Sequence, residues 1–129
     1  MYSFSFERLD VWQLSRKLVK DVYLAIKLFP VEERYALTNQ LQRAVISVVS
    51  NIAEGSSRNS LKDQIRFIEI AYGSLMETYT QLCIALDLCY ISEEEFSLFD
   101  LKIKEISNKL NALRNNYLHK IESNNQLNK

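Results

Sequence analysis

Glycine and proline are scarce in this chain, which has two glycines and one proline among 129 residues. Soluble proteins contain on average about 7% glycine and about 5% proline. β-Sandwiches and barrels need many tight turns, and these two residues are the usual means of making them. The shortage therefore argues against a many-stranded fold and favours long helices that are joined by few connections.

The chain also has no net charge, because 16 basic residues balance 16 acidic ones. A neutral chain has no overall electrostatic field that would attract nucleic acid. There is no run of about 18 apolar residues, so we expect no membrane-spanning segment. The first residues lack the basic and apolar regions of a signal peptide, and we expect a cytoplasmic protein.

Cysteine and histidine are too few for the common metal and catalytic sites. Cys83 and Cys89 lie six positions apart on one expected helix. That spacing suits neither an easy disulfide nor a zinc site. His119 is the single histidine, and near a helix end it is more typical of a surface residue than of a catalytic one.

The sequence contains no Walker A motif, no Gly-x-Gly-x-x-Gly and no Gly-x-Ser-x-Gly. Glu54, Glu69 and Glu77 leave one weak alternative, an enzyme with a carboxylate metal site. The Glu-x-x-His pairs of di-iron bundles are absent, however. We therefore expect no enzymatic activity, no metal and no cofactor.

Apolar residues recur at helical spacing in four segments of the chain. The first spans residues 10–29, and the second begins between 32 and 38 and ends at 54. The third spans 60–90 and the fourth begins at 92. Steps of four and three residues imply helices that cross at a shallow angle of about 20°. The sequence thus predicts an all-α fold, an antiparallel up-and-down four-helix bundle.

Helix start and stop signals mark several of these boundaries. Asp10 is the expected N-cap of the first helix, with Gln13 reaching back to it. Gly55 is the expected left-handed stop of the second helix. Ser92 and Glu95 form a capping box that opens the fourth. We expect a single bundle domain over 1–122 and a polar, frayed C-terminal tail over 123–129.

The first helix carries a second apolar row beside its core stripe, made of Trp12, Val19 and Ile26 with Tyr23 adjoining. One interpretation is a wide core stripe within a single bundle. The other is a contact between subunits in which Trp12 is an anchor, because tryptophan is favoured at interface centres.

The second helix has almost no charge on the side away from its core. Ser47, Ser50 and Asn51 stand there in place of long charged side chains. Short side chains allow another backbone to come close, as at the small-residue interfaces of membrane helices. We expect this side to be covered by a second copy of the chain, although a mildly polar exposed face would give the same pattern.

The third helix carries Gly73 in its middle, where glycine costs roughly 1 kcal/mol relative to alanine. Close approach of another helix would offset that cost. Ile70 and Ile84 lie on an outer row of the same helix, on either side of Glu77. We therefore predict that these residues belong to an oligomer interface.

A lone buried carboxylate is unfavourable, so we expect Glu77 to lie in a buried or interfacial polar network with arginine. The expected members of this network are Gln40, Arg43, Asn51, Glu54, Arg58 and Glu77.

Nucleic-acid binding is the main alternative function. Basic residues of the first helix and around the loop before the third could touch phosphates, and self-association would multiply these contacts. On a single protomer, such residues are more often solvated surface charges. The candidates are Arg16, Lys17, Lys20, Lys27, Arg58, Lys62 and Arg66.

Several motifs occur in the order found in one known family. They are Leu-Asp-Val-Trp-Gln at 9–13, Ser-Val-Val-Ser-Asn-Ile-Ala-Glu-Gly-Ser-Ser-Arg at 47–58, and Ile-Ala-Tyr-Gly-Ser at 70–74. With these motifs the chain resembles the four-helix bundle proteins encoded by 23S rRNA intervening sequences. The resemblance implies assembly into a ring, usually a homopentamer, without established enzymatic activity.

The same resemblance extends to accessory variability proteins of diversity-generating retroelements. Those proteins are also pentamers and act beside a reverse transcriptase and its RNA. They are notably basic, whereas this chain is neutral. The resemblance implies partners of two kinds. The first is other copies of the chain, and the second is structured RNA or a protein that handles RNA.

Overall fold

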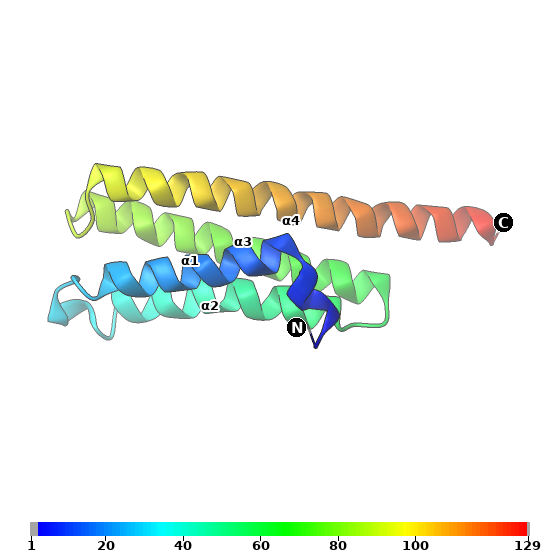
Figure 1. Ribbon diagram of the computed structural model, residues 1–129, viewed down its shortest axis with the longest axis horizontal. Coiled ribbons are helices and arrows are strands. Elements are labelled where there is room, and N and C mark those ends of the chain that lie inside the picture. Colours follow the sequence, from blue (N-terminus) through cyan, green and yellow to red (C-terminus); the bar gives the residue numbers. More distant parts are fainter. Residues whose placement is uncertain (1–2, 129) are drawn as a thin grey trace.

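The computed structural model describes residues 3–128, and no strand occurs among them. Its helices are α1 (Asp10–Ile26), α2 (Leu37–Ser56), α3 (Leu61–Asp87) and α4 (Glu93–Leu127). Two short 3-10 turns, η1 (Ser5–Arg8) and η2 (Val31–Glu33), come before α1 and α2. The four helices run alternately in opposite directions and lie side by side (Figure 1). The predicted all-α four-helix bundle is confirmed.

Each helix packs against the next one in the chain, and α1 also packs against α4. The order around the bundle is therefore α1, α2, α3, α4. In Figure 1 the α1–α2 and α3–α4 connections lie at one end, and the α2–α3 turn lies at the other. Because the helices follow one another around the bundle in this order, the α1/α4 face and the α2/α3 face are on opposite sides of it.

The core forms where the apolar stripes of the four helices meet. Most of the residues that recur at helical spacing are buried, among them Leu18, Leu41 and Ile52, as are Leu75 and Ile106, and the others are half-buried against this core. Burying a side chain of this size contributes about 1.5–3 kcal/mol, which makes the stripes the main source of stability.

The caps of the last two helices follow the sequence signals. Ser60 caps α3, because its Oγ accepts a hydrogen bond from the backbone amide of Asp63 at 3.0 Å. At the start of α4, Ser92 Oγ accepts from Glu95 N, and Glu95 Oε1 accepts from Ser92 N, both at 3.1 Å. The predicted capping box is confirmed.

The predicted cap of the first helix is wrong. Asp10 is the first residue inside α1, and Leu9, whose side chain cannot accept a hydrogen bond, occupies the N-cap position. Gln13 does reach back, but its Nε2 donates to the carbonyl oxygen of Glu7 at 2.7 Å. That contact ties the η1 turn to α1, which the local sequence pattern does not reveal.

The predicted left-handed stop at Gly55 is also wrong. No glycine in residues 3–128 has a positive φ, and α2 continues through Ser56. A Cβ atom on Gly55 would lie 3.0 Å from the Cβ of Phe67 and 3.3 Å from the carbonyl oxygen of Gln64. Gly55 is therefore needed because α3 passes close to it.

The last helix is longer than the others and runs past the end of the bundle, where α2 turns into α3 (Figure 1). Tyr117 is the last buried residue of α4, and residues 122–128 are exposed. The helix continues to Leu127, through most of the segment that we expected to fray, and Lys129 lies outside the described residues.

Candidate functional site

The three glutamates of the alternative metal site point to separate partners. Glu54 pairs with Arg58, Glu69 pairs with Arg114 at 3.1 Å, and Glu77 contacts Gln81. Within residues 3–128, no three His, Cys, Asp or Glu side chains come together in a group that could hold a metal ion. The carboxylate cluster that the alternative requires is therefore not formed in the protomer.

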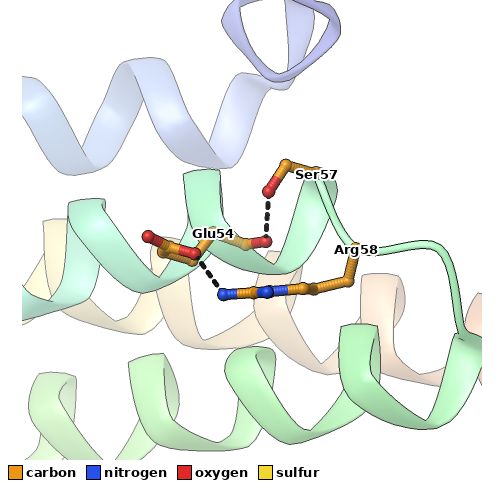
Figure 2. A network of polar contacts seen from close by, with 3 residues as sticks. All are labelled: Glu54, Ser57 and Arg58. Carbon is orange, nitrogen blue, oxygen red and sulfur yellow. Dashed lines mark hydrogen bonds and ion pairs between the residues drawn. The ribbon is translucent and has the colours of Figure 1, made fainter.

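Two of the predicted network residues, Glu54 and Arg58, do meet at the end of α2. An Arg58 guanidinium nitrogen lies 2.7 Å from Glu54 Oε2, and Ser57 Oγ donates to the Glu54 carbonyl oxygen at 2.8 Å (Figure 2). The Arg58 guanidinium also lies 4.8 Å from the centre of the Phe67 ring. All three residues that Figure 2 labels are exposed, so this part of the network is a surface ion pair.

A different polar contact lies in the seam between α2 and α3. The hydroxyl oxygens of Ser47 and Ser74 are 2.8 Å apart, which joins the two helices. Asn51 Nδ2 donates to the carbonyl oxygen of Ser47 at 2.8 Å and to its Oγ at 3.0 Å. Ser47 and Asn51 were predicted as contact residues, but a polar contact of Ser74 was not. Its partner depends on how far α2 and α3 are shifted along each other, which the sequence pattern does not define.

Glu77 is exposed in the protomer, so of the two forms of the predicted network, buried or interfacial, the buried form does not occur within a single chain. Its nearest polar contact is Gln81 Nε2, at 3.4 Å from Glu77 Oε1. Gln40 and Arg43 are exposed, and no hydrogen bond or ion pair of theirs to Glu77 is formed among residues 3–128. The residue that is buried here is Gln81, whose Oε1 has no hydrogen-bond partner among the described residues.

The second apolar row of α1 contributes mostly to the chain's own core. Ile26 is buried, and Trp12, Val19 and Tyr23 are half-buried and pack against the core. The Trp12 ring meets Phe6 edge-on, with the ring centres 5.1 Å apart. For Ile26 the burial agrees with a wide core stripe, whereas the other three residues retain exposed surface.

The predicted interface residues on α3 face away from the bundle. Ile70 and Ile84 are each 42% exposed, and a Cβ on Gly73 would meet no atom within 4 Å. Packing within the described residues 3–128 therefore does not account for this glycine. A shallow groove of about 430 Å³ between α3 and α4 runs past it.

A further exposed isoleucine, Ile46 on α2, was not among the predicted interface residues. It lines a shallow depression of about 260 Å³ between α1 and α2, together with Arg16, Val19, Val49 and Ser50. Ile46 lies outside the core stripe of α2, as Ile70 and Ile84 lie outside that of α3, so the same helical spacing could have identified it.

The predicted nucleic-acid contacts fall into two separate groups. Arg16, Lys17, Lys20 and Lys27 are exposed along α1, and none of them pairs with a carboxylate within 4 Å in the described part of the chain. The other group lies around the α2–α3 turn and comprises Arg58, Lys62 and Arg66, all of which are exposed. The guanidinium groups of Arg58 and Arg66 both lie against the Phe67 ring.

None of the helices in the described range is long and apolar enough to cross a membrane. No curated protein matches the chain. A solved structure from Bacteroides thetaiotaomicron VPI-5482, a protein of unknown function from the S23 ribosomal protein family, is similar in fold. Its TM-score is 0.73 and its sequence identity is 24%, and the alignment covers 81% of this chain and 97% of that one.

The sequence itself matches a family model over most of its length. Residues 7–112 match the model described as 23S rRNA-intervening sequence protein. This range contains the motifs at 9–13, 47–58 and 70–74, and it spans α1, α2, α3 and more than half of α4. The chain therefore belongs to the 23S rRNA-intervening sequence protein family.

Proposed function

We propose that this protein has no catalytic activity and acts as a homopentameric ring in the cytoplasm, serving as a scaffold or an accessory binding module. The observation that carries the proposal is the outer surface of α3. There Gly73 opens onto empty space between two isoleucines, Ile70 and Ile84, that are each 42% exposed. A second copy would cover the isoleucines, and the missing side chain would let its backbone come close.

A cyclic ring joins two different patches, one from each neighbouring copy, and the ring closes only if these patches lie at an angle to each other. The α1/α2 face and the outer surface of α3 lie on neighbouring sides of the bundle. The first of these surfaces contains the exposed parts of Trp12, Val19 and Tyr23, and it also contains Ile46. Their relative position supports closure into a ring, and the two free cysteines are compatible with a reducing compartment.

Native mass spectrometry of the wild-type protein tests the assembly, with five copies as the expected mass. Ile70→Glu should reduce the number of copies, because it places a charge in the proposed contact. Val31→Glu is the matched control, since Val31 is also exposed but lies in the η2 turn, away from α3. A wild-type monomer at micromolar concentration would contradict the proposal.

Glu77→Ala provides a second test of the same contact. Glu77 lies on the outer surface of α3, and its carboxylate has no ion-pair partner among residues 3–128. In the ring we expect it to pair with a cation of the neighbouring copy, with Arg43 as the candidate. Glu77→Ala should therefore lower the melting temperature of the wild-type ring by more than it lowers the melting temperature of the Ile70→Glu protein, in which the contact is already lost. An equal effect on both would oppose the idea.

Binding of structured RNA is the second candidate function, and one observation favours it. Arg58, Lys62 and Arg66 are exposed together around the α2–α3 turn, and five-fold symmetry would repeat this cluster five times. Affinity for an RNA hairpin should then fall steeply as salt rises, and Lys62→Glu with Arg66→Glu should reduce the slope. An affinity that does not change with salt would argue against this role.

A further inference from the structure

The α1/α4 face, on the side of the bundle opposite α2/α3, carries a cluster of exposed leucines. The exposed fractions are 52% for Leu24, 80% for Leu28, 58% for Leu98 and 66% for Leu101. An isolated exposed leucine needs no explanation, but a group of four on one face of one domain is a candidate contact surface. These residues contribute little to the core of the protomer, so their exposure requires another reason.

Two adjoining hollows follow the line between α1 and α4 on this face. One, of about 230 Å³, is lined by Leu24, Leu28 and Leu98. The other, of about 460 Å³, is lined by Lys17, Lys20 and Glu105. Between them the Lys102 ammonium of α4 lies 2.7 Å from the Asp21 carboxylate of α1, and both residues line both hollows. The two hollows form one groove: its apolar part also contains Glu95, and its charged part also contains Leu14 and Ile106.

The charged part of the groove has opposite signs on its two sides. Lys17 and Lys20 stand on the α1 side, and Glu105 stands on the α4 side. None of these three side chains forms an ion pair within 4 Å in the described part of the chain, where Lys102–Asp21 is the pair that bridges the helices at this level. Unpaired cations thus line one wall and an unpaired carboxylate lines the other.

We propose that this face binds a second copy of the chain, related by a two-fold axis parallel to the helices. Such an axis places α1 of each copy over α4 of the other and keeps every residue at the same height along the bundle. Lys17 and Lys20 of one copy would then face Glu105 of the other, and Leu24 and Leu28 would face its Leu98 and Leu101. The four helices at the contact would alternate in direction, as in an ordinary antiparallel bundle.

Self-complementarity is what favours a second copy over a different protein or nucleic acid. Because Lys17, Lys20 and Glu105 line the same hollow, a two-fold axis brings opposite charges together at two symmetric places. Leu24, Leu28 and Leu98 line the neighbouring hollow and come together in the same arrangement. A phosphate backbone would match the lysines, but it would leave the leucines exposed and would repel Glu105. This contact uses a face that the proposed ring leaves free, so it does not depend on the ring; where both contacts form, it joins one ring to another and raises the mass above five copies.

The experiment uses two charge-reversal variants of the full chain. Lys17→Glu with Lys20→Glu makes both walls acidic, and Glu105→Lys makes both walls basic. Either variant alone should associate through this face at least about tenfold more weakly than the wild type, because attraction becomes repulsion at both symmetric places. An equimolar mixture should recover the association, since the acidic α1 of one variant meets the basic α4 of the other. Mixing does not alter contacts within a chain, so recovery identifies a contact between copies.

Sedimentation velocity over a range of concentrations measures the association, and circular dichroism checks that each variant is folded. Leu98→Asn should weaken association to a similar degree, whereas Leu127→Asn, at an exposed position outside the groove, should not. The proposal is overturned if the variants associate as the wild type does, or if their mixture behaves like the separate variants. These outcomes are distinct from failure of the ring, because Ile70→Glu acts on the opposite side and should leave the mixing result unchanged.

Discussion

The hydroxyl oxygens of Ser47 and Ser74 lie 2.8 Å apart and connect the middles of α2 and α3. Ser74 is buried and Ser47 is half-buried. A hydrogen bond of this kind contributes about 1 kcal/mol to stability. Like the packing around Gly55, this contact depends on how far the two helices are shifted along each other.

Replacing either serine by alanine should therefore lower the free energy of unfolding by about 1 kcal/mol. A double-mutant cycle with Ser47→Ala and Ser74→Ala, followed by urea unfolding, should give a coupling energy of about 0.5–1.5 kcal/mol. Ser50→Ala is the control, because Ser50 is exposed on the same helix. Fully additive effects of the two substitutions would show that the hydroxyl pair does not form in solution.

The two glycines should respond to alanine in opposite ways. Gly55→Ala places a Cβ 3.0 Å from the Cβ of Phe67 and should destabilise the protein by about 1–2 kcal/mol, even after the gain in helix propensity. Gly73→Ala meets no atom within 4 Å and should stabilise the protomer by about 0.5–1 kcal/mol. Thermal unfolding in an Ile70→Glu background, which keeps the α3 surface free, measures both effects. A stabilising Gly55→Ala would mean that α3 does not pass Gly55 as described, and a destabilising Gly73→Ala would mean that the surface around Gly73 is not open.

The contrast between these glycines shows where prediction from sequence succeeds. The four helices, most of the core stripes and the capping box at Ser92 depend on residues close in sequence, and those were predicted. The roles of Gly55 and Ser74 depend on how two helices are shifted along each other, which periodicity does not define. For the same reason the polar network was only partly predicted: Glu54 and Arg58 pair one turn apart, whereas Arg43 and Glu77 would need a contact between helices.

Gln81 offers a test of an unpaired buried group. Its side chain is buried, and its Oε1 accepts no hydrogen bond among the described residues. An unsatisfied acceptor costs about 1–3 kcal/mol, and methionine has a similar length without that cost. Gln81→Met should therefore raise the free energy of unfolding by about 1 kcal/mol, whereas Gln81→Ala should lower it by leaving a cavity. If Gln81→Met is destabilising instead, the amide must have a partner that the protomer does not supply.

Stability should also depend on pH in the alkaline range. Burial raises the pKa of Tyr117 above its ordinary value of 10.0. The pKa of Tyr79 is raised as well, by burial first and then by the nearby Cys83 and Asp100. In the unfolded chain these hydroxyls ionise at lower pH than in the folded one, so unfolding releases protons and the free energy of unfolding falls as pH rises above about 10.

Tyr117→Phe should reduce the decrease in the free energy of unfolding at high pH. The part of the decrease that Tyr79 contributes should remain. Urea unfolding at pH 8, 9.5 and 10.5 measures the slope for the wild type and the variant. Tyr35→Phe is the matched control, because Tyr35 is exposed and should leave the slope unchanged. Equal slopes for the wild type and Tyr117→Phe would mean that the Tyr117 hydroxyl is not buried in solution.

The end of α4 should be dispensable for the stability of the bundle. Residues 123–128 are exposed, and the last buried side chain of the helix belongs to Tyr117. A helical end without tertiary contacts gains little from its own hydrogen bonds, because helix formation in isolation is marginal in water. Removing 123–129 should therefore change the free energy of unfolding by less than about 0.5 kcal/mol. Circular dichroism should show a loss of helix signal in proportion to the residues removed. A larger destabilisation would mean that this end contacts another copy in the assembled protein, a result that native mass spectrometry of the truncated chain would confirm by a lower mass.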